Sequence, residues 1–377
     1  MPSHRELYIG LMSGTSLDGI DSVLVDFSNG RFRLIHCRHQ AFPEELKATL
    51  TELIVANRPP DSLIAKTTSR KLADCYVDAI NKLLKLTADS KEHIAKHDIV
   101  AIGNHGQTIY HQPPLSIQID DGQHIADQTG IAVINQFRQA DLAIGGQGAP
   151  LVPAFHREIF SAPNKFVAVV NIGGIANITE LPVTGNVSGF DTGPGNTLMD
   201  CWIQQAHGLE FDRNGEWASG GTVRPQLLNA MLADPWFCKD PPKSTGREYF
   251  NRLWVERMLA KCDTIDDPQD IQATLCEVTA MSISKALQRS NDPPHEAYIC
   301  GGGAHNKYLM KRLQQLSPAT NLMASEVRGI PADWVEACAF AWLARAHHNG
   351  IVGNIPEVTG AAKPCVLGTT HIPRKLT

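Results

Sequence analysis

The sequence predicts an α/β protein with two lobes. Three observations support this fold class. The 377-residue chain is long enough for two domains. An order of three strands, one helix and one strand occurs twice along it, and a glycine-bearing turn joins the first two strands of each series. The composition agrees, because 43% hydrophobic and 19% charged residues are typical of a folded chain with sizeable cores.

The first series lies in the N-terminal part of the chain. Residues 7–12 and 21–27 are apolar, β-prone runs, and residues 31–39 supply a third alternating strand. Apolar residues with helical spacing follow over 64–84, before a buried-type strand at 98–103. This order predicts a hairpin, a third strand, a helix and a further strand.

The second series starts past the middle of the chain. It has runs at 166–172 and 175–181 and a strand that ends near Asp191, followed by a helical pattern at 269–289 and a strand at 297–300. A last helical pattern, 332–348, completes the second half.

Pro- and Gly-rich connections indicate the domain boundary. Two of them fall between the series, so we expect the boundary within 135–165 and assign residues 1–140 to an N-terminal lobe and 141–377 to a C-terminal lobe. A third connection, 235–246, predicts an insertion or lid that extends to about residue 265.

Charge and hydropathy exclude several partners. A net charge of -5 lacks the basic surplus that phosphate-backbone binding demands, so no nucleic-acid partner is expected. No segment approaches the roughly 20 apolar residues of a spanning helix and no signal peptide begins the chain, which predicts a cytoplasmic protein without membrane contact. The nine cysteines form no C-x-x-C pair and indicate reduced thiols.

Residues 14–21, at the turn between the first two strands, include two glycines, two hydroxyls and two carboxylates. Free backbone N–H groups in such a turn suit a phosphate chain, although the turn alone is equally typical of an ordinary hairpin. Gly173 and Gly174 occupy the corresponding turn of the second series, which favours a pair of phosphate loops. The first loop comprises Gly14, Thr15, Ser16, Leu17, Asp18, Gly19, Ile20 and Asp21.

Two further strand-to-helix junctions are candidate sites. Asp191 ends a strand beside a Gly-rich helix start, where α/β proteins place catalytic groups. The alternative is a capping role, but Asn196 or Thr197 can supply that cap. Gly301, Gly302 and Gly303 remove side chains from a helix start and would admit a flat ligand, although glycine-rich turns also occur without one.

Polar side chains follow the strand at 98–103. His105, Gln107 and Thr108 offer the donors and acceptors that a sugar requires, although His105 is equally consistent with a structural role. Arg138 and Asp141 form a second polar strip. Glu336 lies in the first turn of a helix, where an acid also favours the helix dipole.

With these motifs in place, the chain resembles the 1,6-anhydro-N-acetylmuramic acid kinases, bacterial peptidoglycan-recycling enzymes of the superfamily that includes sugar kinases, heat-shock chaperones and actin. The resemblance extends from residue 12 to residue 337. It rests on MSGTSLDGID, NHGQT, INQFRQADLAIGGQGAPLVPAFH, VNIGGIANIT, GFDTGPGN, CGGGAHN and GIPADWVEA, in that order.

The resemblance implies a two-lobed ribonuclease H-like fold with ATP in a cleft between the lobes. Residues 14–21 would hold the phosphates, Gly173 and Gly174 would face them, and 301–303 would lie against the nucleoside. Asp191 is implied as general base. The implied sugar contacts are His105, Gln107, Thr108, Arg138, Asp141 and Glu336.

The implied reaction converts anhydro-N-acetylmuramic acid, ATP and water into N-acetylmuramic acid 6-phosphate and ADP. Mg2+ would assist, with Asp18 as its expected protein ligand. The family resemblance also implies a homodimer.

Two other function classes are consistent with parts of the sequence. A glycosidase with Asp191 and Glu336 as paired carboxylates would need no nucleotide and leaves the glycine turns unexplained. A nucleotide-gated binding protein would share the fold, but the chain has no separate peptide-binding segment. Nucleotide-dependent turnover of a sugar discriminates among the three.

Overall fold

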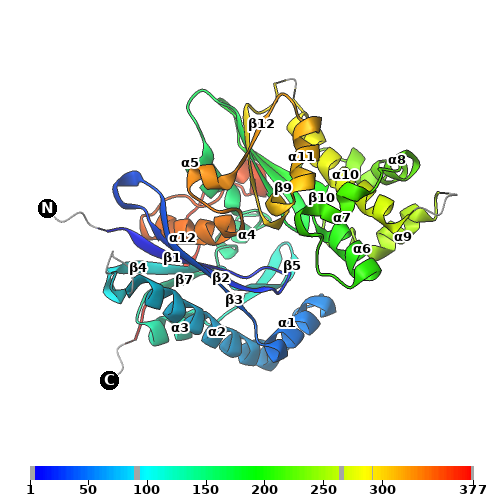
Figure 1. Ribbon diagram of the computed structural model, residues 1–377. Helices are drawn as coiled ribbons and strands as arrows, with labels where there is room; N and C mark the ends of the chain where they lie inside the picture. Colours follow the sequence, from blue (N-terminus) through cyan, green and yellow to red (C-terminus); the bar gives the residue numbers. More distant parts are fainter. Residues whose placement is uncertain (1–4, 89–93, 263–266, 291, 375–377) are drawn as a thin grey trace. The chain divides into compact units, whose positions relative to one another are not determined.

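The computed structural model describes residues 5–88, 94–262, 267–290 and 292–374. The chain divides into two compact units, the first formed by Met1–Ile159 with Trp334–Thr377 and the second by Phe160–Asp333. Each unit contains a main β-sheet with helices packed on it (Figure 1). The predicted α/β class is therefore confirmed.

The sheet of the first unit has the order β13-β7-β4-β1-β2-β3. Strands β1, β2 and β3 are antiparallel neighbours, whereas β4 and β7 run parallel to β1. The strands are β1 (Leu7–Met12), β2 (Gly19–Asp26), β3 (Arg33–Ala41), β4 (Ile99–Asn104), β7 (Val133–Asn135) and β13 (Thr369–His371).

The sheet of the second unit repeats this arrangement, with the order β10-β9-β8-β11-β12. Its first three strands are antiparallel and the next two are parallel. Numbered by appearance, both sheets contain the order 3-2-1-4-5, so the predicted repeat of elements is confirmed. The strands are β8 (Val167–Ile172), β9 (Ile175–Leu181), β10 (Ser188–Pro194), β11 (Glu296–Cys300) and β12 (Asn321–Ala324).

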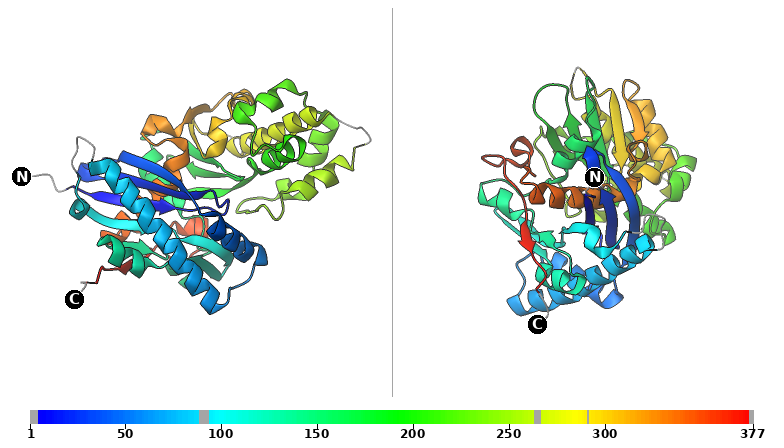
Figure 2. Two further views of the ribbon diagram at one scale, coloured as in Figure 1. Left: turned by 60° about the horizontal axis from the view of Figure 1, so that its bottom comes forward. Right: turned by 90° about the vertical axis from the view of Figure 1, so that its left-hand side faces the viewer.

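Helices α2 (Ser62–Ala88) and α12 (Val335–His348) cover opposite faces of the first sheet (Figure 1; Figure 2). Helix α12 packs directly on the strand backbones, because a Cβ added at Gly10 or Gly103 would lie 2.0 Å from a carbonyl oxygen of the helix. The expected lobe boundary at residue 140 differs from this arrangement. Residues 141–159 and 334–377 both belong to the first unit. The second of these ranges contains α12, which packs on the sheet at Gly10 and Gly103.

Several elements of the first unit lie outside the predicted series. A Pro- and Gly-rich segment at 112–122 forms part of a small antiparallel sheet of β5 (Gln107–Gln112) and β6 (Leu115–Ile119). Its Asp121 caps the following helix by accepting a hydrogen bond from the His124 N–H. The remaining helices are α1 (Glu44–Ala56), α3 (Gly122–Thr129), α4 (Gln139–Ala143), α5 (Val152–Phe160, its last residue in the second unit) and α13 (Pro356–Thr359).

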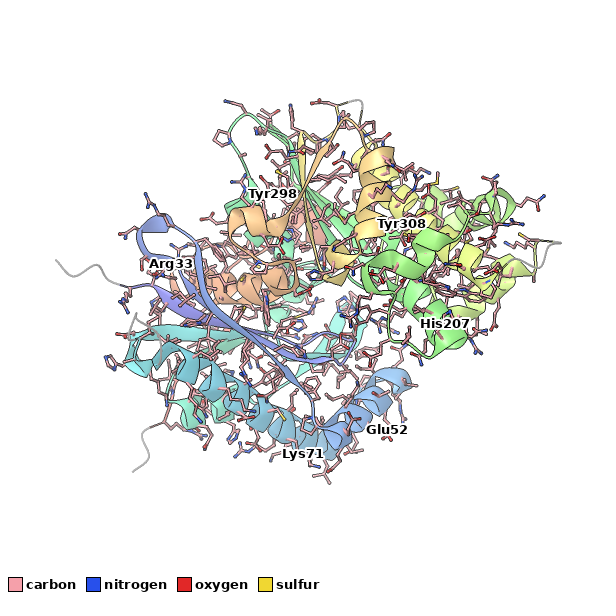
Figure 3. The ribbon with its side chains drawn as sticks, viewed as in Figure 1. Arg33, Glu52, Lys71, His207, Tyr298 and Tyr308 are labelled. Atoms are coloured by element: carbon pink, nitrogen blue, oxygen red, sulfur yellow. The ribbon has the colours of Figure 1, made fainter. Side chains whose placement is uncertain are left out.

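Helix α10 (Pro268–Leu287) forms the centre of the second unit. It packs against strands β9 and β10 and against helices on its other sides, and 15 of its residues are buried. Tyr298 on β11 and Tyr308 on α11 are labelled in Figure 3. The other helices are α6 (Thr197–His207), α7 (Glu216–Gly220), α8 (Pro225–Leu232), α9 (Arg252–Leu259) and α11 (Lys307–Leu316).

The region predicted as an insertion or lid is part of the second core. A short 3-10 helix (Pro235–Cys238) leads to a loop and then to α9, and the rings of Trp236, Phe250 and Trp254 are buried against one another. Its aromatic content explains the difference, since these rings supply core volume. Residues 263–265 of the predicted segment lie outside the described residues.

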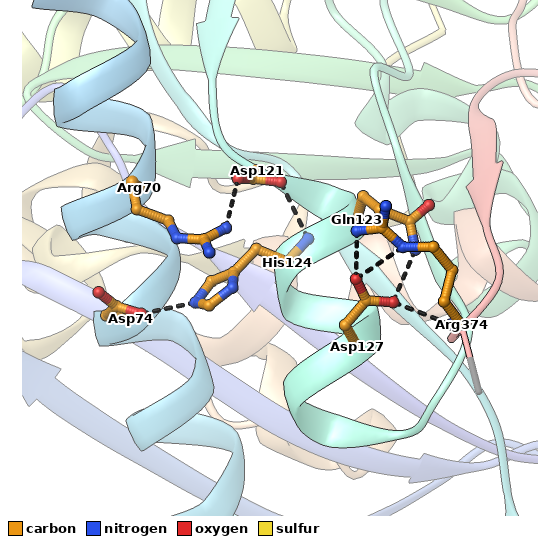
Figure 4. A network of polar contacts seen from close by, with 7 residues as sticks. All are labelled: Arg70, Asp74, Asp121, Gln123, His124, Asp127 and Arg374. Atoms are coloured by element: carbon orange, nitrogen blue, oxygen red, sulfur yellow. Dashed lines mark hydrogen bonds and ion pairs between the residues drawn. The ribbon is translucent and has the colours of Figure 1, made fainter. Parts of the chain in front are cut away.

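The C-terminal segment is fixed to the first unit by a polar network (Figure 4). Arg374 donates to Asp127 on α3, and Asp127 also accepts from Gln123. Nearby, His124 pairs with Asp74 of α2 at 2.6 Å. No helix within the described ranges is long and apolar enough to span a membrane.

Candidate active site

The loop between β1 and β2 is anchored by two residues. Leu17 buries its side chain with φ at 57°, and a Cβ at Gly19 would lie 2.2 Å from the Gln40 carbonyl oxygen. The side chains between and before them, Thr15, Ser16 and Asp18, are exposed. The loop therefore holds a fixed backbone while presenting polar groups to solvent, as a phosphate loop must.

Polar side chains of the first unit form hydrogen bonds with the residues at the start of this loop. Gln107 Nε2 donates to the Gly14 carbonyl at 3.1 Å, and the Ser13 hydroxyl lies 2.7 Å from that of Tyr76. Thr108 Oγ1 accepts from Gln118 Nε2 at 3.1 Å. The structure thus brings the predicted phosphate loop together with Gln107 of the predicted sugar strip.

His105 is a neutral side chain that orients Arg138. Arg138 Nη2 donates to His105 Nε2 at 2.9 Å, and because a guanidinium can only donate, that nitrogen carries no proton. Burial, together with the neighbouring Arg138 charge, lowers the pKa of His105 to about 3. His105 thus positions Arg138 through Nε2, whereas its Nδ1 is buried without a hydrogen-bond partner among the described residues, and the sugar contact stays a prediction.

Three predicted charges meet in the first unit. Glu336 opens α12, and its pKa is raised by burial and by the Asp21 carboxylate, while Arg138 acts in the opposite direction. Arg138 itself has its pKa lowered by burial to about 10. Residues from β2, the start of α4 and the first turn of α12 therefore form one electrostatic group, so Glu336 does more than favour a helix dipole.

Asp141 has a different role from the predicted sugar contact. Its carboxylate is fully buried and accepts hydrogen bonds from Asn354 Nδ2 and Thr359 Oγ1, each at 2.7 Å, and from the Gly148 N–H at 2.8 Å. These bonds tie the glycine-rich loop at 145–148 to the C-terminal segment. Asp141 positions a loop, and its oxygens already have partners.

We expect Asp141→Ala to lower the free energy of unfolding by about 3 kcal/mol, because buried donors lose their acceptor. Chemical denaturation with constant m-value would measure the loss. The same variant, assayed well below its melting temperature, should keep its KM for the sugar that the sequence predicts as substrate within about twofold, a change well under 1 kcal/mol. A large rise in KM with unchanged stability would restore the sugar-contact role.

Asp120 is a partly buried carboxylate that the sequence did not point to. It accepts from Asn104 Nδ2 at 2.8 Å and from Asn135 Nδ2 at 2.9 Å, with Gln136 Nε2 at 3.4 Å. Burial nevertheless raises its pKa to about 6. The signal available was its position at the end of an alternating strand, directly after Gln118 and Ile119.

Several buried polar atoms around this strip have no hydrogen-bond partner among the described residues. They are both acceptors and donors, as a ligand with several hydroxyls would require. An unpartnered buried group costs free energy, so a ligand that supplies the missing partners is favoured. These atoms are His105 Nδ1, Gln107 Oε1, Gln118 Oε1 and Arg138 Nε.

The hairpin turn at Gly173 and Gly174 is the counterpart in the second unit. Space around a Cβ at Gly173 is open to 3.5 Å, whereas one at Gly174 would lie 2.7 Å from Thr197 Oγ1. Asn196 closes the turn, because its N–H donates to the Gly173 carbonyl at 2.8 Å. The turn therefore has one face packed and one face accessible.

The triple-glycine turn packs beside this hairpin. A Cβ at Gly301 would lie 2.3 Å from Asn171 Oδ1, and one at Gly303 would lie 2.2 Å from the Ile172 side chain. Only Gly302 leaves open space. Close packing on β8 thus accounts for two of the three glycines, and Gly302 is the position that a flat ligand can approach.

Asp191 lies on β10 in a partly enclosed setting. Its Oδ2 accepts from the Thr245 N–H at 2.9 Å, and its own N–H donates to the Lys243 carbonyl at 3.0 Å. Burial raises its pKa to about 6, with the nearby Glu248 charge acting in the same direction and the Thr245 bond opposing it. A carboxylate with this pKa is ionised at neutral pH yet accepts a proton readily.

A magnesium site needs few protein ligands. No cluster of three or more His, Cys, Asp or Glu side chains is placed to hold a metal ion within the described residues. Mg2+ keeps several waters and often takes only one or two carboxylates. The exposed carboxylate of Asp18 fits that requirement.

Two units of one strand order, each with a glycine-bearing hairpin between its first two strands, define the ribonuclease H-like class of sugar kinases, heat-shock chaperones and actin. A family model described as anhydro-N-acetylmuramic acid kinase matches residues 6–373. The chain therefore belongs to the anhydro-N-acetylmuramic acid kinase family and is a kinase.

Curated relatives agree with this assignment. A Shewanella putrefaciens protein named "Anhydro-N-acetylmuramic acid kinase" is 46% identical over 366 residues, which cover 96% of this chain and 97% of the relative. A Shewanella halifaxensis protein of the same name is 45% identical over 374 residues, covering 98% and 99%.

Solved structures share less with the chain. Component A of (R)-2-hydroxyglutaryl-CoA dehydratase from Acidaminococcus fermentans has a TM-score of 0.45 and 11% identity, covering 89% of this chain and 96% of that one. A ROK family glucokinase from Streptomyces griseus, solved with glucose and AMPPNP, has a TM-score of 0.39 and 13% identity, covering 90% and 99%. Both scores are below 0.5, so the family assignment rests on the sequence relatives.

Proposed function

We propose that the protein phosphorylates 1,6-anhydro-N-acetylmuramic acid with ATP and water, giving N-acetylmuramic acid 6-phosphate and ADP. Family membership supports the reaction class. The observation that carries the mechanism is the carboxylate of Asp191, whose raised pKa and single backbone N–H partner suit a general base. Mg2+, when bound near Asp18, would neutralise charge on the phosphates.

The substrate determines what the base acts on. In an anhydro-sugar, O6 is bonded to C1 and has no proton to lose. Asp191 therefore takes a proton from water, and the water oxygen attacks C1 while the C1–O6 bond breaks. The released O6 attacks the terminal phosphorus of ATP, and ADP leaves. Ring opening and phosphoryl transfer are coupled in this scheme.

The remaining residues bind and orient the substrates. In the first unit, residues 14–21 bind phosphate through backbone N–H groups, and the unpartnered atoms of Gln107 and Arg138 bind sugar oxygens. Thr108 and Glu336 add further polar contacts, and His105 holds the guanidinium of Arg138 in place. In the second unit, Gly173 and Gly174 bind phosphate, and the open space at Gly302 admits the nucleoside.

Turnover in 18O-labelled water tests this scheme. We expect ADP release that depends on the anhydro-sugar, with one label on the C1 hydroxyl of the product and none on the oxygen that bridges C6 and phosphorus. N-acetylglucosamine serves as the non-anhydro control and should be a poor substrate. Hydrolysis of the anhydro bond without ATP would support a glycosidase instead, and efficient phosphorylation of the control would indicate a conventional sugar kinase.

A further inference from the structure

A short strap, residues 243–247, lies over the catalytic carboxylate in the second unit. Its Lys243 carbonyl accepts from the Asp191 N–H, and its Thr245 N–H donates to Asp191 Oδ2. The Trp236 indole N–H donates to the Ser244 carbonyl at 3.3 Å. The strap is therefore bound to Asp191 on one side and to the aromatic core on the other.

A carboxylate, that of Asp234, binds two of the aromatic side chains that pack beside the strap. Asp234 accepts from the Tyr249 hydroxyl at 2.6 Å and from the Trp254 indole N–H at 2.9 Å. Phe250, which follows the strap, is fully buried. These contacts fix the backbone of the strap and therefore the position of the side chain of Arg247.

That side chain is Arg247, and it lies against the phosphate hairpin. A Cβ added at Gly174 would lie 2.9 Å from Arg247 Nε and 3.0 Å from Nη2, closer than side chains pack. The guanidinium thus reaches the backbone of the turn because residue 174 is a glycine. The same Cβ would lie 2.7 Å from the Thr197 hydroxyl, so the side chains of Arg247 and Thr197 both lie against Gly174.

Two hydroxyls, one beside Gly174 and one on the strap, lack partners. Thr197 Oγ1 and Thr245 Oγ1 are buried, and neither has a hydrogen-bond partner among the described residues. Among the described residues, no carboxylate oxygen lies within 4.0 Å of the Arg247 guanidinium. The Arg247 guanidinium and the Thr197 hydroxyl converge on the glycine turn, and the strap carries a second unpartnered hydroxyl on Thr245. A guanidinium and hydroxyls in this arrangement form a recognition site for a tetrahedral oxyanion.

We propose that Arg247 binds the terminal phosphoryl group of ATP, together with Thr197 and Thr245. The proposal rests on the proposed function and assigns a role to a segment that the family motifs above do not include. Through Thr245 and Arg247, the strap connects the general base to the group that is transferred. A donor fixed where charge develops acts mainly on the transition state, so its loss should lower kcat more than it weakens substrate binding.

Arg247→Gln tests the proposal against a matched control. We expect kcat to fall about 100-fold or more, as removal of one such donor typically does. By calorimetry, the Kd for AMPPNP should rise about tenfold while the Kd for ADP changes less than twofold, because only the first ligand has a terminal phosphate group. Arg252→Gln removes an exposed arginine from the start of α9, where it pairs with Glu256, and should leave all three values unchanged.

Thr197→Val is the second variant, because valine keeps the shape and removes only the hydroxyl. It should weaken AMPPNP binding in the same selective way even where Arg247→Gln fails to fold. Equal weakening of ADP and AMPPNP, or unchanged kcat in Arg247→Gln, would overturn the assignment. Wild-type protein that turns over the anhydro-sugar while these variants behave normally would refute this inference and leave the proposed function intact.

Discussion

Asp191→Asn is expected to lower kcat by about 100- to 10,000-fold, the usual contribution of a general base. The amide keeps the shape, and its oxygen can still accept the Thr245 N–H bond, but it cannot take a proton from water. Steady-state ADP release with the anhydro-sugar measures the loss. AMPPNP binding should stay near the wild-type value, and near-normal turnover would exclude Asp191 as the base.

The same carboxylate predicts two pH effects that check this result. Wild-type activity should fall about tenfold per pH unit below pH about 6, where Asp191 becomes protonated. Because the folded-state pKa lies above the ordinary value of 3.8, the charge destabilises the folded protein increasingly as pH rises from about 4 to 6. At pH 8, Asp191→Asn should therefore have a higher melting temperature than wild type and a free energy of unfolding larger by at most about 3 kcal/mol. At pH 4, the variant and the wild type should have nearly the same stability.

Valine at Gly14 or Gly173 is expected to raise the Kd for ATP analogues about 10- to 100-fold, the loss of one or two charge-assisted backbone bonds. Both positions have room, since the nearest contact of an added Cβ is 3.5 Å. The side chain would therefore block the approach of a phosphate without disturbing the fold. Calorimetric titration with AMPPNP, and separately with the anhydro-sugar, distinguishes the two effects.

Gly195→Val provides the contrasting variant, because its Cβ would lie 2.2 Å from the Gly173 carbonyl oxygen. We expect that variant to lose stability and both ligands together. If valine at Gly14 or Gly173 weakened sugar and nucleotide equally, the two turns would be structural and not phosphate loops.

Local patterns in the sequence were sufficient for the order of strands and helices along the chain in both series. The hairpins around Gly14 and Gly173 were predictable because apolar runs and turn residues alternate within about 25 positions. The position of Glu336 was not predictable, since α12 packs mainly on β1 and β4, which lie more than 230 residues earlier in the chain. Only the close approach at Gly10 and Gly103 reveals that contact, and a glycine alone does not identify the helix that covers it.

Roles within the site were predictable in part. Arg138 and Asp141 lie three residues apart in one motif, yet one carries an unpartnered donor and the other has every oxygen engaged. Asp141 depends on Asn354 and Thr359, which no local pattern connects to it. Asp120 and Arg247 were missed for the same reason, because their neighbours come from distant strands and turns.

The return of the chain to its first unit at Trp334 has a consequence for synthesis on the ribosome. All of Phe160–Asp333 emerges before α12 does, so the second unit can complete its sheet while one face of the first remains uncovered. The nascent first unit must wait about 180 residues, or on the order of ten seconds or more at 5–20 residues per second, for its last core helix. Until then the face of β1 and β4 that α12 covers is exposed, so we expect chaperones to bind the incomplete nascent chain.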